Sequence, residues 1–375
     1  MSLRWLLDQQ AVRSVITGAS GPDQMADTAA VSQLPSLDNE LQAQLSHVYH
    51  DKVLAHIRGR DLMHYRRLGK TELKVSDIGF GAWQLGNHDQ WGGMDDNTAH
   101  HLVANALDSG CNLFDTAPNY AKTNSERLLG ETLRGVRKDV VLVSKFGHKP
   151  EGGTDYSPEA FRDSLHGSLE RLKTDYLDVV LVHSPPLEVL NGQHPIWAAM
   201  KRAQTEGKVR FYGASTDYAF EVRETLETTD AQVLELLFNA LHQDVRLVFD
   251  QVRDNDVGVI TKVPLDSGWL GGKYTAKTLF DGVRMRWSEA DIAQRASLVE
   301  QLAWLPTAER NLAQQSLAYL LSYDEVSSVI PGIRSQSQLE ANLGATGQRL
   351  SRADQTRLET FWDGFTDKGT HLLPW

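Results

Sequence analysis

Apolar runs rich in valine and leucine recur through residues 61–375, and segments with helical periodicity separate them. Strands that are buried on both faces of a parallel sheet have this continuous apolar pattern. The runs predict eight strands, at Asp77–Gly81, Cys111–Asp115, Val140–Lys145, Leu177–His183, Val209–Ala214, Val233–Phe238, Val257–Val263 and Ser328–Pro331.

Helical patterns fill the gaps between these runs, at Asp96–Ser109, Ser125–Leu133, Pro158–Leu172, Gln243–Arg253 and Ala308–Ser322. Eight strand–helix units over about 300 residues predict an α/β fold, the (β/α)8 TIM barrel. A doubly wound open sheet is the alternative, but no GxGxxG sequence follows the first strand. The segment His64–Ser76 predicts a hairpin that precedes the barrel.

Polar residues stand where three of the apolar runs end. Asp115 and Tyr120 follow one run, Lys145 ends the next, and His183 ends a third. The carboxyl ends of barrel strands meet at one mouth, so these four side chains are expected to converge there. In such a group the Lys145 cation lowers the pKa of Tyr120, Asp115 holds the lysine, and His183 orients a carbonyl oxygen.

The composition limits the class of partner. A net charge of −11 argues against broad binding to nucleic acids or anionic membranes. Cys111 is the only cysteine and is expected to be a core residue, so no intrachain disulfide is predicted. The N-terminal sequence MSLRWLLDQQ is too short in apolar residues for a signal sequence, and no run reaches a membrane span, so the expected location is cytoplasmic.

Several motifs, in this order, resemble those of the aldo-keto reductases. They are GFGAWQLG with Gly81, FDTAPNY followed by SERLLGETL, the strand-end Lys145, SLERLKTDYLDVVLVH, PLDSGWLGGKY and VIPGIRSQSQLEAN. The resemblance covers residues 64–365 and is nearest to bacterial members. It implies a hairpin that plugs the barrel floor and a catalytic tetrad of Asp115, Tyr120, Lys145 and His183, with Tyr120 as general acid.

The resemblance also implies a cofactor site after the last strand. Arg334 is expected to grip the 2′-phosphate of NADPH, while Gln338 and Asn342 bind near the adenine. Gly332 and Ser335 belong to the same segment, which opens a helix and is suited to phosphate. Family members often carry a glutamate where this chain has Ala341. The turn PLDSGWLGGKY is expected to bring Leu265, Ser267, Gly268 and Lys273 near the pyrophosphate.

The expected nicotinamide floor departs from the family pattern. Ser215-Thr216 stands where the family usually has Ser-Asn, Glu235 where it has Gln, and Lys262 where it has an aromatic residue. Ser215 and Glu235 can still bind the carboxamide. Glu235 and Lys262, on neighbouring strands, are expected to form a charge pair, for which a purely structural role is the alternative.

Residues 1–60 repeat part of the barrel sequence. Ser2–Thr28 aligns with Ser316–Asn342 at a constant offset of 314 positions, with 10 identities in 27 residues. The extension therefore resembles the C-terminal part of an aldo-keto reductase. It is either the remnant of a tandem pair or an appendage for packing or regulation. In it Ser20 replaces Arg334 and Thr28 replaces Asn342, so cofactor binding is assigned to the second copy.

The two segments are thus an extension, 1–60, and a barrel, 61–375. Val12–Thr17 is expected to lie outside the catalytic barrel, which has no free edge. Asp38–Arg58 predicts an amphipathic helix that packs on the barrel surface or on a second subunit, so a homo-oligomer through the extension is considered.

The sequence predicts NADPH-dependent reduction of small aldehydes or ketones. Trp83 and Trp91 are expected to wall the substrate pocket, and no metal-binding spacing is found. Two alternatives stay open. One is an NAD(P)-dependent sugar or alcohol dehydrogenase. The other is a cofactor-sensing accessory subunit with little turnover.

Overall fold

The computed structural model describes residues 2–8, 22–48, 63–88 and 93–374. The chain forms two compact units, Met1–Leu62 and Met63–Trp375, which are called here the N-terminal unit and the barrel unit. Predictions for Val12–Thr17 and Trp91 lie outside the described residues. Among the helices that are described, none is long and apolar enough to cross a membrane.

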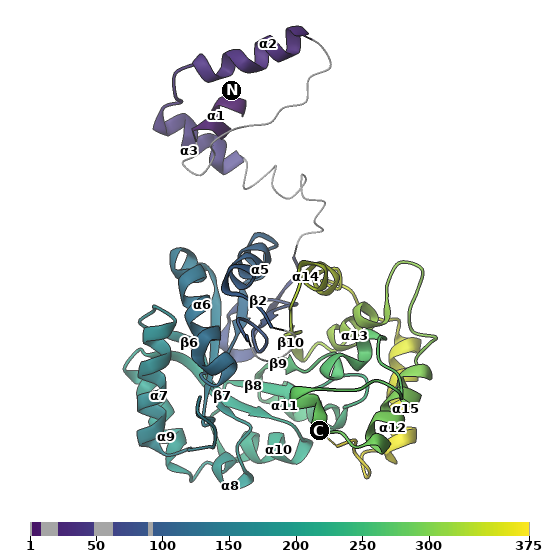
Figure 1. Ribbon diagram of the computed structural model, residues 1–375. Coiled ribbons are helices and arrows are strands. Elements are labelled where there is room, and N and C mark those ends of the chain that lie inside the picture. Colours follow the sequence, from purple (N-terminus) through teal and green to yellow (C-terminus); the bar gives the residue numbers. More distant parts are fainter. Residues whose placement is uncertain (1, 9–21, 49–62, 89–92, 375) are drawn as a thin grey trace. The chain divides into compact units, whose positions relative to one another are not determined.

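The described part of the barrel unit contains an eight-stranded parallel sheet with helices around it (Figure 1). The strands, in sheet order from β3 to β10, are β3 Phe80–Gly81, β4 Leu113–Asp115, β5 Val141–Phe146, β6 Leu177–His183, β7 Val209–Thr216, β8 Val233–Leu237, β9 Gly258–Lys262 and β10 Val326–Val329. Parallel bridges from Ile78 to Val329 and from Gly81 to Gly332 join the first strand region to the last. The sheet therefore closes into the predicted (β/α)8 barrel.

The helices follow the strands in alternation. They are α5 Asp96–Asp108, α6 Asn124–Leu133, α7 Pro158–Arg171, α8 Leu187–Leu190, α9 Pro195–Thr205, α10 Ala219–Thr228, α11 Phe249–Asp254, α12 Glu289–Glu300, α13 Leu312–Leu321, α14 Gln336–Leu343 and α15 Arg352–Thr366. The single helix predicted at Gln243–Arg253 is wrong. The 3-10 helix η6, Asp244–Val248, precedes α11, and the backbone at Val248 is not helical (φ −121°, ψ 13°).

A hairpin of β1 Tyr65–Arg67 and β2 Lys74–Ser76 closes the floor of the barrel, as the sequence predicted. Its Leu68 is fully buried and belongs to the core inside the barrel, with Val75, Leu113, Val141, Val143, Val179, Leu181, Val233, Ile260 and Ile330. Next to it, Gly69 has φ +49°, and a Cβ there would lie 2.2 Å from the backbone nitrogen of Gly258. Only glycine allows this close approach, so the absence of a side chain at Gly69 lets the turn pack against the barrel floor.

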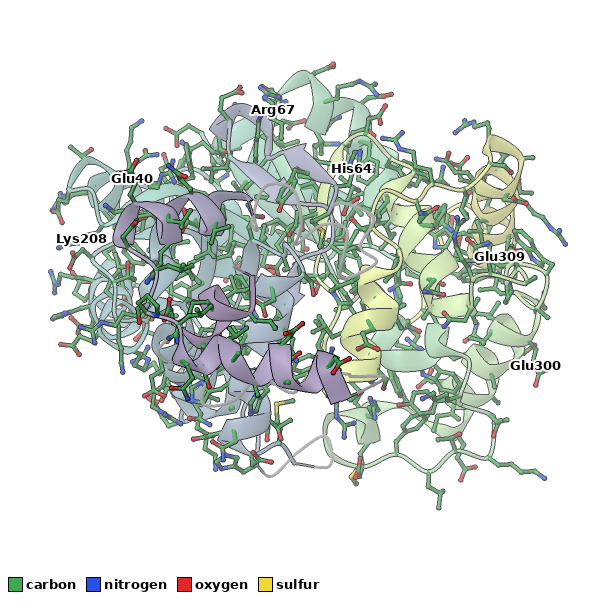
Figure 2. The ribbon with its side chains drawn as sticks, turned by 90° about the horizontal axis from the view of Figure 1, so that it is seen from above. Glu40, His64, Arg67, Lys208, Glu300 and Glu309 are labelled. Carbon is green, nitrogen blue, oxygen red and sulfur yellow. The ribbon has the colours of Figure 1, made fainter. Side chains whose placement is uncertain are left out.

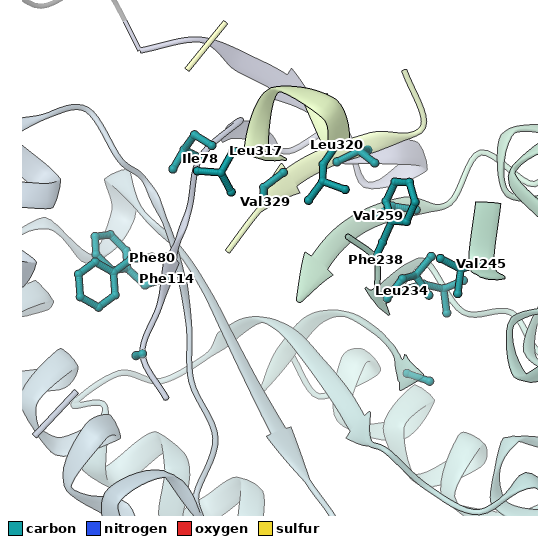
Figure 3. Packing of buried hydrophobic residues seen from close by; sticks show 14 of the residues in the cluster. Ile78, Phe80, Phe114, Leu234, Phe238, Val245, Val259, Leu317, Leu320 and Val329 are labelled. Atoms are coloured by element: carbon teal, nitrogen blue, oxygen red, sulfur yellow. The ribbon is translucent and has the colours of Figure 1, made fainter. Parts of the chain in front are cut away.

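A second core lies between the sheet and the surrounding helices. Figure 3 shows Leu317 and Leu320 of α13 near Ile78 and Val329, in the region where the barrel closes. Cys111 is buried in the same core, as expected, and burial raises the pKa of its thiol to about 12. Charged side chains lie at the periphery, among them the exposed Arg67, Lys208, Glu300 and Glu309 (Figure 2).

The N-terminal unit contains three described helices, α1 Ser2–Leu7, α2 Pro22–Ala30 and α3 Asn39–Val48. The last covers the first part of the helix predicted at Asp38–Arg58, and the remainder lies outside the described residues. Asp8 links two parts of the unit. It accepts hydrogen bonds from Arg4 at 2.5 and 3.0 Å and one from the backbone N–H of Leu37 at 2.8 Å.

Candidate active site

The strand periodicity sets which side chains face the barrel interior. Successive residues of a strand point to opposite faces, so residues two apart share a face. Val143 and Leu181 belong to the apolar interior core, and Lys145 and His183 follow them by two positions on β5 and β6. The same spacing relates Leu113 to Asp115. The polar strand-end residues therefore form the uppermost interior layer, above the apolar core.

A cavity of about 690 Å³ opens at this layer. Most of the residues predicted from the sequence line it. They are Gly81, Trp83, Asp115, Tyr120, His183, Glu235, Lys262, Leu265, Ser267, Gly268, Lys273, Gly332, Arg334, Gln338 and Asn342. Lys145 and Ser215 are buried, do not line the cavity, and contact residues that do.

Lys145 is fully buried and bound to Asp115. Its Nζ lies 2.6 and 2.5 Å from the two carboxylate oxygens and 3.2 Å from the carbonyl oxygen of Thr116. Although burial alone would lower it, the Asp115 and Glu235 carboxylates raise the pKa of Lys145 above its usual value. Burial and repulsion from Glu235 raise the pKa of Asp115. The raised pKa favours the charged form of Lys145, which lies buried behind Asp115, a residue that lines the cavity.

Tyr120 lies beside this cation. Lys145 Nζ is 5.2 Å from the centroid of the Tyr120 ring. Lys145 favours the phenolate, as the sequence predicted, but burial has the larger effect and the pKa of Tyr120 is raised above its ordinary value. The phenol is held in its protonated form, which is the form that a proton donor needs.

His183 completes the group of four. Its ring stands edge-on to the ring of Tyr120, with centroids 5.9 Å apart, and its Nδ1 is buried without a hydrogen bond among the described residues. Burial, with Lys145 as a second cause, lowers the pKa of His183 well below its usual value. A neutral imidazole carries one N–H donor, so His183 can donate one hydrogen bond to a substrate oxygen.

The expected charge pair between Glu235 and Lys262 is replaced by a longer chain of contacts. Glu235 Oε2 lies 3.2 Å from Lys145 Nζ, while Lys262 Nζ lies 2.8 Å from a carboxylate oxygen of Asp217. Ser215 joins the two, since its Oγ lies 3.0 Å from Glu235 Oε1 and 2.8 Å from Lys262 Nζ. Glu235 thus pairs with Lys145, and Lys262 pairs with Asp217, instead of with each other.

The other end of the cavity is built on the start of α14. Ser335 is the N-cap and accepts a hydrogen bond from the backbone N–H of Gln338, whose own Oε1 accepts one from the N–H of Arg334. The amide Nδ2 of Asn342 is buried and has no hydrogen-bond partner among the described residues. Gly268, on the 3-10 helix η7 Asp266–Gly271, has φ +100° and lines the cavity beside Ser267. An amide donor without a partner, a glycine in the wall and an arginine fit a phosphate-bearing dinucleotide.

Reasoning from the sequence missed several residues that line the cavity, and four of them are polar or aromatic groups of interest. Asn119, His148 and Tyr274 line the wall, and Arg284 reaches it from the 3-10 helix η8, Gly282–Arg286. Arg284 and Arg334 both line this cavity, and burial, with Arg334 as a further cause, lowers the pKa of Arg284. The cations in DGVRMRW were the available signal, but a loop with no periodicity does not reveal where it folds.

Several known proteins are similar to this chain in sequence and in fold. A sequence profile of the Aldo/keto reductase family matches residues 77–363. The chain is 28% identical over 314 residues to the NADH-specific methylglyoxal reductase of Escherichia coli strain K12, covering 77% of this chain and 95% of that protein. It is 30% identical over 292 residues to L-galactose dehydrogenase of Arabidopsis thaliana, covering 75% and 87% respectively.

A solved structure of the same family is similar to the barrel unit. The holo form of aldo-keto reductase AKR11C1 from Bacillus halodurans matches with a TM-score of 0.67 and 25% identity, over 80% of this chain and 96% of that one. The chain belongs to the aldo/keto reductase family, whose members are oxidoreductases that use a nicotinamide cofactor.

Proposed function

We propose that the protein reduces small aldehydes or ketones to alcohols with NADPH, and that Tyr120 is the general acid. The observation that carries the proposal is the buried Lys145–Asp115 ion pair beside the Tyr120 ring at the cavity. A buried ion pair of this kind costs desolvation and gives a weak stabilising return. Its position beside a protonated phenol supports a catalytic use.

The reaction needs a hydride and a proton. The bound cofactor supplies the hydride to the carbonyl carbon. Tyr120 gives its hydroxyl proton to the carbonyl oxygen, and the phenolate that forms is stabilised by the adjacent Lys145 cation. His183 holds the same oxygen by one N–H. Trp83, whose ring centroid is 6.4 Å from that of Tyr120, lines the cavity beside it.

The proposal of NADPH rests on charge at the other end of the cavity. Lys273, Arg284 and Arg334 all line it. Arg284 and Arg334 repel each other, and a dianionic phosphate would relieve that repulsion. The methylglyoxal reductase from E. coli is NADH-specific, so similarity to it does not favour NADPH. The proposal of NADPH therefore depends on Arg284 and Arg334 of this chain.

A second candidate is oxidation of a sugar or another alcohol by NAD(P). The observation in its favour is the 30% identity to L-galactose dehydrogenase. The same four side chains would then act in the reverse direction, with Tyr120 starting as the base.

The test is Tyr120→Phe, which removes the hydroxyl and keeps the ring. Carbonyl reduction should fall at least about 10²-fold, the scale of a lost general acid, while NADPH affinity, measured by fluorescence titration, stays near that of the wild type. Tyr212→Phe is the matched control, because its hydroxyl binds Asp230 outside the cavity. Near wild-type turnover in Tyr120→Phe would refute the proposal.

A further inference from the structure

Lys145 lies between two carboxylates. Its Nζ is 2.5 Å from Asp115 and 3.2 Å from Glu235, and the three side chains are at most 4% exposed. One ammonium facing two carboxylates leaves an excess of negative charge away from water. Such an excess is unfavourable unless another cation or a proton offsets it.

The second cation reaches Glu235 through a serine. A serine hydroxyl has one hydrogen to donate and lone pairs to accept. Lys262 has only donors, so Ser215 accepts from Lys262 and donates its single hydrogen to Glu235. Glu235 is thereby connected directly to Lys145 and through Ser215 to Lys262.

We propose that Glu235 is a positioning residue that acts through Lys145 to keep the Tyr120 phenol protonated, so that Tyr120 remains a proton donor into the alkaline range. The inference rests on the proposed role of Tyr120. It concerns a residue that departs from the glutamine expected in the family. The Lys145 cation pulls on the phenolate, and each carboxylate beside it offsets part of that pull.

The charged and titratable groups around this site come from strands β4 to β9 and from the turns that follow them. Three are anionic and two are cationic, and the two histidines nearby have lowered pKa values and are neutral. The groups are Asp115 after β4, Tyr120, Lys145 on β5, His148, His183 on β6, Asp217 after β7, Glu235 on β8 and Lys262 on β9. The sum of these charges is negative. Removing the charge of Glu235 makes it neutral, leaves the Lys145–Asp115 pair in place and takes away a carboxylate that contacts Lys145 directly.

The experiment is Glu235→Gln, which removes the charge and keeps an acceptor for Ser215. Tyrosinate absorbance is titrated in the protein without substrate, for the wild type and for Glu235→Gln, each with and without Tyr120→Phe. The difference isolates Tyr120. Its pKa should fall by about 1–3 units, the scale of a nearby charge, and the alkaline limit of carbonyl reduction should move down by the same amount.

Glu126→Gln is the matched control. Glu126 is a fully buried glutamate paired with Arg171, and it accepts a hydrogen bond from Ser144, which points to the opposite face of β5 from Lys145. This variant should leave the Tyr120 titration unchanged. If Glu235→Gln folds poorly, Glu235→Leu removes the same charge and must produce the same downward shift.

An unchanged Tyr120 titration in Glu235→Gln would overturn the inference even if Tyr120→Phe is inactive. A downward shift together with an active Tyr120→Phe protein would support the electrostatic coupling and refute the proposed function instead. The two ideas therefore fail by different measurements.

Discussion

Ser2–Thr28 of the N-terminal unit resembles Ser316–Asn342 of the barrel unit, with 10 identities in 27 residues, and the two segments are called here the N-terminal copy and the barrel copy. Two of their described helix boundaries fall at aligned residues. α1 ends at Leu7 and α13 ends at Leu321, which are aligned residues at the offset of 314 positions. α2 and α14 begin at the aligned residues Pro22 and Gln336. Beyond the aligned residues, α3 begins at Asn39 and α15 at Arg352, an offset of 313 positions.

A tertiary contact is repeated as well. Asp8 accepts from the backbone N–H of Leu37 at 2.8 Å, and the aligned Ser322 accepts from the N–H of Leu350 at 2.8 Å. A carboxylate after α1 and a hydroxyl after α13 thus bind the backbone two residues before α3 and α15, respectively. The copies share local structure although most of their side chains differ.

What differs is the chemistry at the cofactor positions. The barrel copy has Arg334 and Asn342 where the N-terminal copy has Ser20 and Thr28. The barrel copy also shares its cavity with Lys273 and Arg284, which come from other parts of the barrel. A helix can be specified by its own segment, whereas a dinucleotide site needs groups that the rest of the fold supplies.

The largest expected effect is in the barrel copy. Arg334→Ala should weaken NADPH binding by roughly 1.5–3 kcal/mol, or about 10- to 150-fold, the scale of a charge-assisted hydrogen bond. NADH should be affected much less, because it lacks the 2′-phosphate. Fluorescence titration of both cofactors measures this, and Ser20→Ala, at the aligned position, is the control that should change nothing. Equal losses for NADPH and NADH would show that Arg334 does not read the phosphate.

A smaller effect, which depends on pH, should distinguish the Asp8–Leu37 contact from the Ser322–Leu350 contact. Hydrogen bonds from Arg4 and from the N–H of Leu37 lower the pKa of Asp8 from 3.8 to about 2. A carboxyl whose pKa is lower in the folded state stabilises the fold at every pH above its unfolded-state pKa. This stabilisation is lost as the pH falls from 3.8 toward 2. Asp8→Ala should speed amide exchange at Leu37 by about 3- to 10-fold at pH 6, and the difference should shrink toward pH 3.

Ser322→Ala is the matched variant for that measurement, read at Leu350. A hydroxyl does not titrate in this range, so its effect should be constant between pH 6 and 3. The same pH profile in both variants would mean that the charge of Asp8 is irrelevant to the contact.

The smallest effect is expected from deleting residues 1–60. NADPH affinity and turnover should stay within about twofold of the wild type, as for a change away from the site, because β10 closes the barrel with the barrel's own segment. Cofactor titration and light scattering after size exclusion measure affinity and oligomeric state. A truncated protein that folds but no longer binds NADPH would indicate that the extension exchanges with Ser328–Pro331.

The barrel could be predicted because strands that are buried in a parallel sheet have continuous apolar sequences. The ends of those runs also identified Asp115, Lys145 and His183. The strand predicted at Asp77–Gly81 is shorter in the structure, Phe80–Gly81, and its earlier residues join β10 only through a single bridge from Ile78 to Val329. The sequence did not reveal the contact of Glu235 with Lys145, because these residues lie on β8 and β5 and meet across the barrel interior. Burial, which outweighs Lys145 in setting the pKa of Tyr120, is likewise a property of the assembled fold.

The floor hairpin has a consequence for folding during synthesis. Arg67 forms an ion pair with Asp256, 189 residues later, and the N–H of Lys70 bonds to the carbonyl of Asp256 at 2.6 Å. Leu68 can therefore take its place only after the chain has been made beyond β9. Contacts of such high sequence separation are slow to form. On the ribosome the hairpin has to wait, exposed, for its partners, and the floor of the barrel is among the last parts to close.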